Sequence, residues 1–283
     1  MRVLVTGAGG MLGRDVVRVA EQVGHGVTAL AREDLDITDA GQVDRAVDAE
    51  RPEALINCAA WTDVDGAESD LAAATAVNGG GARNLAAATA RLGCRIVYPS
   101  TDYVFDGTSG EPYIESDPVN PLSAYGKSKL AGEGETAANN PRHFIVRASW
   151  LFGVNGKNFV DTMLGLGRSL DEVVVVTDQV GCPTYTGHLA EGLVRLIEWD
   201  AFGIHHMAGA GECSWYDFAA EIFHQAGIEC RVLSTTTDML SRPAPRPAYS
   251  VLATERDLAI HLPPWQEGLA AFLAERAEAG TPA

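Results

Sequence analysis

The chain contains little lysine, and its acidic residues far outnumber its basic ones. Its 283 residues include 21 Lys+Arg, only three of them lysine, against 38 Asp+Glu, so the formal net charge is -17. A surface this acidic repels phosphate-rich polymers and anionic lipid, so we expect neither nucleic-acid binding nor charge-driven membrane binding. An anionic substrate would need a local positive pocket.

The chain also lacks a disulfide pattern and a long apolar run. Its five cysteines are odd in number, widely spaced and without a CxxC pair, which predicts a reducing compartment and no metal or disulfide framework. Four glycines and then Arg14 and Asp15 interrupt the apolar N-terminus, so neither a signal peptide nor a membrane span is predicted. We therefore expect a cytoplasmic protein.

Short apolar runs alternate with helix-length segments through the first half of the chain. Helices are predicted over Gly79–Leu92 and Ser123–Ala138, the second after the helix-start signal Asn120-Pro121. Repeated alternation of strand and helix predicts an α/β fold, a Rossmann-type doubly wound parallel sheet. The predicted strands are Arg2–Thr6, Gly26–Leu30, Ala54–Cys58, Cys94–Ser100 and Phe144–Ala148.

The alternation becomes less regular after residue 150. The proline-rich segment Arg242–Pro247 is predicted to be an extended loop, and a last helix is expected after Pro263-Pro264. We therefore divide the chain into a sheet domain, 1–150, and a smaller C-terminal α/β lobe, 151–283, with some segments returning to the sheet. Further strands are expected at 172–177 and 203–207, and helices at 188–199 and 214–225.

A glycine-rich turn joins the first predicted strand to the first helix. Gly7, Gly10 and Gly13 have the GxxGxxG spacing, with Met11 and Leu12 between the last two. Such a turn permits close backbone approach to a diphosphate, and the helix N-terminus favours its negative charge. This predicts a dinucleotide site in residues 1–150, although glycine-rich turns also occur without a ligand.

The end of the second strand bears on cofactor choice. An acidic residue that would bind a ribose 2′-hydroxyl is missing, and Ala31-Arg32 stands there instead. A guanidinium at this place can receive a 2′-phosphate, which favours NADP over NAD. The alternative is that Arg32 is a solvated surface residue.

Tyr125 and Lys129 are four residues apart in the second predicted helix, and so share one helical face. An ammonium there is expected to lower the pKa of the phenol, which would suit Tyr125 to protonate a carbonyl oxygen during reduction. Thr101, at the end of the fourth strand, lies 24 residues before Tyr125. A strand-end hydroxyl followed by this Tyr–Lys pair is the arrangement of short-chain dehydrogenases. Lys127, between the two, is predicted to be solvated.

Several longer motifs closely resemble the dTDP-4-dehydrorhamnose reductase family, and the likeness covers nearly the whole chain. The motifs are Asn57-Cys-Ala-Ala-Trp-Thr-Asp-Val-Asp65, Ser100-Thr-Asp-Tyr-Val-Phe105, Tyr125-Gly-Lys-Ser-Lys-Leu-Ala-Gly-Glu133, Arg147-Ala-Ser-Trp150, Asn158-Phe-Val-Asp-Thr-Met163, Asp178-Gln-Val-Gly-Cys-Pro-Thr184, Ser214-Trp-Tyr-Asp-Phe218 and Leu262-Pro-Pro-Trp265.

The resemblance implies roles at matching positions. Thr101, Tyr125 and Lys129 match the catalytic triad, and Thr101, Asp102 and Trp150 match positions that contact the nucleotide sugar. Relatives often carry a smaller ring where Trp61 stands. The resemblance, the glycine turn and the end of the second strand together give the predicted cofactor set Gly7, Gly10, Met11, Leu12, Gly13, Arg32, Asp36, Ile37, Ala59, Ala60, Trp61, Thr62, Tyr125 and Lys129.

The implied activity is reduction of the C4 ketone of dTDP-4-dehydro-L-rhamnose by NADPH or NADH, for deoxysugar and polysaccharide precursors. Two alternatives stay open. The chain is either a reductase of another dTDP-4-keto sugar or a non-catalytic regulatory subunit that binds a dinucleotide. Some relatives are associated with magnesium, but no ligand set for a metal can be placed here. The chain is expected to be a monomer or a homodimer.

Other aromatic and basic residues have two interpretations. Trp150 packs either on a sugar or in the core, whereas Trp199, Trp215 and Trp265 lie in apolar helical patterns typical of core. Arg246, in the proline-rich loop, either meets a pyrophosphate or is solvated.

Overall fold

A computed structural model describes residues 1–278 of the chain. Its centre is a parallel sheet of six strands in the order β10-β5-β4-β3-β1-β2. The inner strands β1, β3, β4 and β5 are largely buried, as expected for a parallel sheet with helices on both faces, whereas the edge strand β2 has no buried residue. Their bounds are β1 Arg2–Thr6, β2 Gly26–Leu30, β3 Ala54–Asn57, β4 Arg95–Thr101, β5 His143–Ala148 and β10 Gly203–His206.

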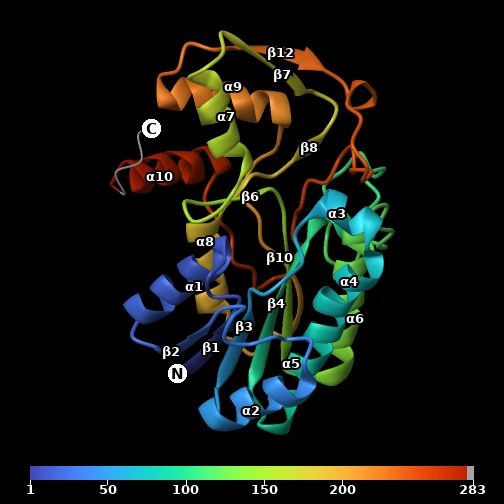
Figure 1. Cartoon of the computed structure of the whole chain (residues 1–283), viewed down its shortest axis with the longest axis vertical. Helices are drawn as coiled ribbons and strands as arrows, with labels where there is room; N and C mark the ends of the chain where they lie inside the picture. The colour runs from blue at the N-terminus through green and yellow to red at the C-terminus, as the bar shows by residue number, and fades with distance from the viewer. Residues whose placement is uncertain (279–283) are drawn as a thin grey trace.

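Two groups of helices cover the sheet (Figure 1). The helices α1, Met11–Gln22, and α8, Thr186–Leu196, pack together on one face over buried side chains of β1, β3 and β5. The other face carries α2, Ala40–Glu50, α5, Ala82–Arg91, and α6, Ala124–Asn139. Shorter segments precede α5: α3 Val64–Ser69, α4 Leu71–Thr75 and a π-helical turn, Ala76–Gly81.

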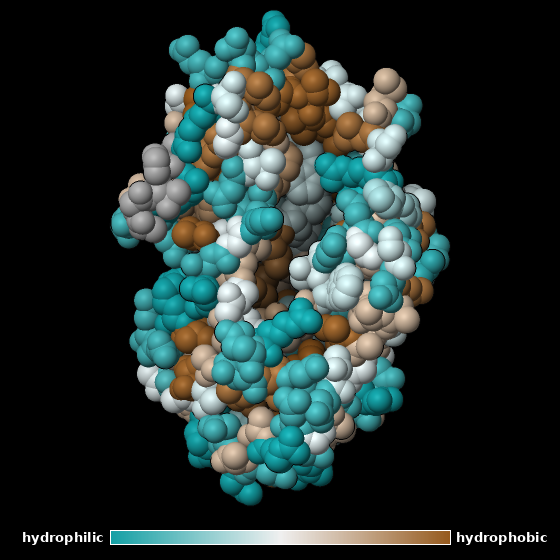
Figure 2. All heavy atoms as spheres, in the orientation of Figure 1, coloured by the Kyte–Doolittle hydropathy of each residue, from teal (hydrophilic) through white to brown (hydrophobic). Residues whose placement is uncertain are grey.

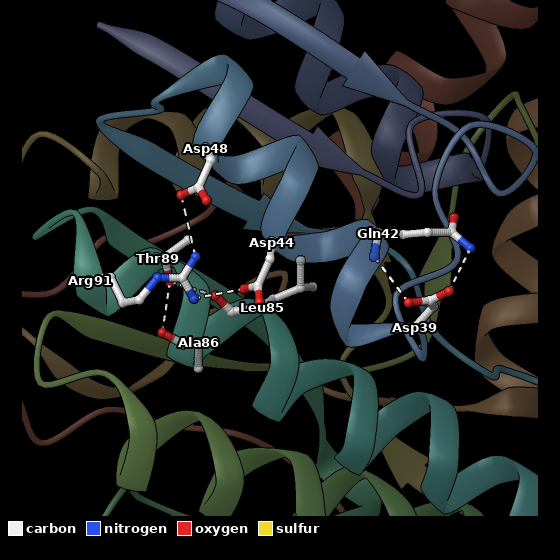
Figure 3. A network of polar contacts seen from close by, with 8 residues as sticks. All are labelled: Asp39, Gln42, Asp44, Asp48, Leu85, Ala86, Thr89 and Arg91. Atoms are coloured by element: carbon white, nitrogen blue, oxygen red, sulfur yellow. Dashed lines mark hydrogen bonds and ion pairs between the residues drawn. The ribbon is translucent and has the colours of Figure 1, made fainter.

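The outer side of α2 and α5 is joined by ion pairs (Figure 3). The Arg91 guanidinium of α5 lies 2.7 Å from Asp44 and 3.3 Å from Asp48, both on α2. At the start of α2 the Asp39 carboxylate accepts a hydrogen bond from the Gln42 amide, which caps the helix. The ion pairs are half exposed, so they order this surface without adding much stability.

The C-terminal lobe lies beyond the carboxyl ends of the sheet strands (Figure 1). Its core is aromatic, with Phe152, Phe218, Trp265 and Phe272 packed at tilted or edge-to-face angles. Its elements are β6 Leu151–Phe152, α7 Phe159–Gly167, β7 Glu172–Val176, β8 Val180–Gly181, β9 Thr184–Tyr185, β11 Cys213–Ser214, α9 Trp215–Ala226, β12 Arg231–Thr235, α10 Trp265–Glu278 and the 3₁₀ turn Thr237–Met239.

The predicted strands and the parallel sheet are confirmed to within one residue at their ends. The helix predicted from Gly79 begins at Ala82 instead, because the preceding turn, with glycines at 79, 80 and 81, is π-helical. Two-residue strands such as β8 and β11 were not predicted, because strands this short are recognised only from the pairing between them. Among the described residues, no helix has the length and apolar character needed to cross a membrane.

Candidate active site

The surface is hollowed between the sheet domain and the C-terminal lobe (Figure 2). The carboxyl ends of β1, β3 and β4 face this cleft (Figure 1). In doubly wound folds ligands bind beyond the carboxyl ends of the strands. The glycine turn, the loop after β3 and Thr101 follow or end these three strands, so the predicted site residues come together at one edge of the sheet.

The glycine turn is shaped by two contacts that exclude a side chain. Gly7 has φ +65°, and a Cβ on it would lie 2.4 Å from the Ala59 nitrogen; a Cβ on Gly13 would lie 2.2 Å from the Gly7 oxygen. Gly10 is the N-cap of α1, and the first turn of that helix carries no acidic residue. The free amides of this helix start therefore fit a dinucleotide diphosphate.

The segment after β2 is exposed at Arg32 and Asp36 and buried at Ile37. The Asp36 carboxylate accepts hydrogen bonds from the Thr38 amide and hydroxyl, which lower its pKa, with a smaller contribution from Arg32. The Ile37 side chain packs in the core beside Leu35, Val43 and Leu55. Any cofactor contact of Ile37 would therefore use its main chain.

The loop after β3 is held by Asn78, which sequence reasoning missed. The Asn78 side chain accepts from the Trp61 amide at 2.8 Å and donates to the Trp61 carbonyl at 3.1 Å and the Ser128 hydroxyl at 2.8 Å. Ala59, Ala60 and Trp61 are partly buried along this loop, and Thr62 is exposed. A buried amide between this loop and α6 thus fixes the loop relative to Tyr125 and Lys129.

Thr101 ends β4, and Tyr125 lies in the first turn of α6, which Ser123 caps by accepting from the Gly126 amide. Lys129 lies one turn later and is buried; its Nζ donates to the Pro99 carbonyl at 2.7 Å and lies 4.2 Å from the centre of the Tyr98 ring. Lys127 is exposed, as predicted.

The prediction that Lys129 lowers the pKa of Tyr125 is wrong for this structure. Burial raises the pKa of the Tyr125 phenol above its ordinary value, and the Asp102 carboxylate raises it further, against a hydrogen bond with Thr101. Desolvation also lowers the pKa of Lys129 to about 8, partly offset by Glu133. Burial dominates because it penalises the charged form of each group, and Lys129 is not among the groups that shift the pKa of Tyr125.

Asp102 is held inside the protein. Its carboxylate accepts from the Ser250 hydroxyl at 2.6 Å and the Thr101 hydroxyl at 3.0 Å, and the side chain is 1% exposed. Burial raises the pKa of Asp102 to about 6, against these two hydrogen bonds. Ser250 was missed by sequence reasoning, because it carried no local signal linking it to β4. A sugar contact of Asp102 stays a prediction.

Trp150 and Trp215 form a stacked pair with ring centres 3.6 Å apart and planes 7° apart. Trp150 has φ 49°, rare for a residue with a side chain, and its ring lies against Gly181. Trp265 is core, as predicted, whereas Trp215 is only partly buried and joins the residue predicted to contact sugar. Both rings pack against the hydrophobic core of the C-terminal lobe.

Arg246 forms an ion pair with Asp65 at 3.0 Å, and Asp65 also accepts from the Ala244 amide. These two contacts attach the proline-rich loop to helix α3. Because Arg246 is paired with Asp65, it is neither a solvated side chain nor an unpaired cation. Among the described residues no group of three or more His, Cys, Asp or Glu side chains could hold a metal ion. All five cysteines are free thiols.

Comparisons with known proteins agree over nearly the whole chain. The family model of the RmlD substrate binding domain matches residues 1–278. A dTDP-4-keto-6-deoxy-D-glucose reductase of Streptomyces niveus is 46% identical over 89% of this chain and 88% of its own. A dTDP-4-dehydrorhamnose reductase of Streptomyces griseus is 45% identical over 96% of this chain and 91% of its own.

A solved structure of similar length supports the same assignment. The dTDP-4-dehydrorhamnose reductase of Bacillus anthracis, solved in complex with NADP, superposes with a TM-score of 0.94 at 39% identity, covering 97% of this chain and 99% of that one. The chain belongs to the RmlD family of dTDP-4-dehydrorhamnose reductases.

Proposed function

We propose that the protein reduces the C4 ketone of dTDP-4-dehydro-L-rhamnose to the alcohol of dTDP-L-rhamnose. The observation that carries the proposal is that Thr101, Tyr125 and Lys129 come together at the sheet edge that also bears the glycine turn. A nicotinamide dinucleotide bound there supplies the hydride. Because the chain belongs to this family, we take the nucleotide sugar to be the substrate whose ketone accepts the hydride.

Each side chain of the triad has one task in this proposal. Tyr125 transfers its phenolic proton to the ketone oxygen, and its raised pKa keeps that proton in place at neutral pH. Thr101 donates a hydrogen bond to the same oxygen as negative charge develops there. Lys129 binds the nicotinamide ribose and stabilises the tyrosinate left by the proton transfer.

The cofactor is NADPH or NADH, and the glycine turn together with Ala59, Ala60, Trp61 and Thr62 would hold it. NADPH is favoured because Arg32 is exposed at the end of β2, where a 2′-phosphate would lie. The relative from Bacillus anthracis was solved with NADP.

Residues 151–283 are proposed to bind the dTDP-sugar, with Trp150 at the boundary. We propose a cytoplasmic reaction, which the five free thiols support, by a monomer or a homodimer. Magnesium, which is associated with some relatives, has no assigned site among the described residues. The regulatory-subunit alternative is disfavoured because a pure binding module needs no Thr101, Tyr125 and Lys129 at one sheet edge.

A second candidate substrate is another dTDP-4-keto sugar, with dTDP-4-keto-6-deoxy-D-glucose favoured by the relative from Streptomyces niveus. The two substrates differ in ring stereochemistry, and the tilt of the sugar over the nicotinamide sets the configuration of the new hydroxyl. The same triad serves either reaction.

The deciding experiment mixes the purified protein with NADPH and each of the two 4-keto sugars separately, and follows cofactor absorbance. We expect oxidation of NADPH with dTDP-4-dehydro-L-rhamnose at a kcat/KM at least tenfold above that with the other sugar. Nuclear magnetic resonance of the product then gives its configuration. Preference for the second sugar would reassign the substrate, and no oxidation with either would favour a binding module.

A further inference from the structure

A buried ionic network lies directly behind the triad, and the proposed mechanism does not use it. Glu133 of α6 and Arg147 of β5 form an ion pair whose side chains are 5% and 3% exposed. The contact has two hydrogen bonds, from Arg147 Nε to Oε1 at 3.0 Å and from Nη2 to Oε2 at 2.8 Å. Charges this deep are costly to bury, so a fully paired arrangement calls for an explanation.

The network is aligned by the register of the sheet. Ser100 of β4 pairs with Arg147 of β5, which pairs in turn with His206 of β10, so the three side chains stand in one row. The Ser100 hydroxyl donates to Glu133 Oε1 at 2.6 Å. Glu133 therefore binds two neighbouring strands from the helix above them.

His206 completes the row as a neutral acceptor. Arg147 can only donate, so Nε2 of His206 accepts from it at 3.4 Å, and Nδ1 donates to the carbonyls of Tyr113 and Ala253. Burial lowers the pKa of His206, which agrees with the neutral ring. Among the described residues of this network, Glu133 is the carboxylate that Arg147 binds, and Glu115 accepts from the His206 amide.

The three residues at the end of β4 are each connected to α6. The Pro99 carbonyl accepts from Lys129, the Ser100 hydroxyl donates to Glu133, and a hydrogen bond with Thr101 acts on Tyr125. Tyr125, Lys129 and Glu133 follow one another at intervals of four, on one face of α6. A shift of β4 along α6 would break all three connections together.

We propose that Glu133, held by Ser100 and Arg147, is a positioning residue that fixes the end of β4 against α6 and places a negative charge one helical turn from the Lys129 ammonium. The inference rests on the proposed function only for its effect on turnover. The charge effect on Lys129 concerns the protein alone.

The groups that face the Lys129 ammonium come from three elements. Glu133 lies on its own helix and raises its pKa, Cys58 follows β3, and the ring of Tyr98 on β4 lies beneath it. Tyr98 and Cys58 stay neutral near pH 8 because burial raises the pKa of each. Glu133 is therefore the neighbouring charge that holds the proton on Lys129.

The test reads the titration of Lys129 directly. The chain has three lysines, so lysine labelled with ¹³C at Cε gives three signals, which Lys127→Arg and Lys157→Arg variants assign. We expect Lys129 to titrate near pH 8 in the native protein. In Glu133→Gln it should titrate about one pH unit lower, because the carboxylate is lost from a poorly screened site. This measurement needs neither substrate nor activity.

Turnover supplies the second readout. Glu133→Gln should lower kcat about tenfold while KM for NADPH changes less than about twofold, and the basic limb of the kcat profile should move with Lys129. Ser100→Ala is the matched control: it loosens β4 but keeps the carboxylate, so kcat should fall while Lys129 titrates at the native pH.

An unchanged Lys129 titration in a folded Glu133→Gln variant would overturn the inference. If that variant does not fold, Glu133→Asp takes its place: a lower kcat with a native titration supports the inference, and an unchanged kcat refutes it. If the native protein oxidises NADPH with neither sugar, the proposed function fails, and the titration still decides the charge effect.

Discussion

The Ser250 hydroxyl donates a hydrogen bond of 2.6 Å to the Asp102 carboxylate, 148 residues earlier in the chain. The other oxygen of the same carboxylate accepts from Thr101 at 3.0 Å. A hydroxyl has one hydrogen, so an ionised Asp102 competes with a substrate ketone for the proton of Thr101. Ser250 weakens that competition because its own hydrogen bond satisfies one oxygen of the Asp102 carboxylate.

Ser250→Ala should therefore lower kcat about tenfold, because the remaining carboxylate binds Thr101 more strongly. Ser250 lowers the pKa of Asp102, so its loss should raise that pKa and shift any limb of the kcat profile near pH 6 to higher pH. Steady-state kinetics from pH 5 to 8 check this. Ser250→Thr keeps the hydroxyl and should restore the native profile; equal losses in both variants would indicate a packing defect.

Asp102 should make the free energy of unfolding depend on pH in a defined window. Burial raises its pKa in the folded protein to about 6, from 3.8. Between these values the folded chain retains a proton that the unfolded chain has lost, so this contribution is full below pH 3.8 and is lost as pH rises through 6.

Asp102→Asn removes the titration. Urea unfolding of both proteins at pH 4, 5, 6 and 7 should show the native protein losing roughly 2.5 kcal/mol relative to the variant across the series. A constant difference between the two proteins would contradict the raised pKa of Asp102.

Tyr125→Phe should keep the fold and still bind NADPH, since only the phenolic oxygen is lost. Its kcat should fall by about 10²- to 10⁴-fold, the range supplied by a general acid. Fluorescence titration with NADPH and single-turnover kinetics check the two halves of this prediction. Substantial residual turnover would remove Tyr125 from the role of proton donor.

Arg32→Ala should weaken binding of NADPH about tenfold and leave NADH nearly unaffected, because only NADPH carries the 2′-phosphate that a guanidinium binds. Dissociation constants for both cofactors, measured by calorimetry at one ionic strength, give the ratio. Arg45→Ala, on an exposed part of α2 away from the glycine turn, controls for a general loss of positive charge. If the binding of both cofactors weakens equally, Arg32 does not bind the 2′-phosphate and is a solvated surface residue.

The parallel sheet, the glycine turn and the Tyr125–Lys129 pair could be predicted from local pattern. Alternating apolar strands, a helix-start glycine turn and an interval of four on a helix each follow from backbone geometry within a few residues. The same holds for Ser123, whose side chain caps α6 as its position before the helix suggests.

Contacts between distant segments could not be predicted in this way. The Ser250–Asp102 hydrogen bond, the Trp150–Trp215 stack and the Glu133–Arg147 pair each join residues that no local periodicity relates. Trp215 lies in an apolar helical pattern that is equally typical of a core residue. Only its stacking on Trp150 in the folded chain distinguishes it from an ordinary core tryptophan.

The amino-acid sequence by itself determined which residues are candidates for the chemistry, because side-chain type and helical spacing are local properties. Only the tertiary structure decided their protonation, raising the pKa of Tyr125 and lowering that of Lys129. The reason is physical: the free energy of a charge depends on how much water surrounds it, and the folded chain as a whole removes that water.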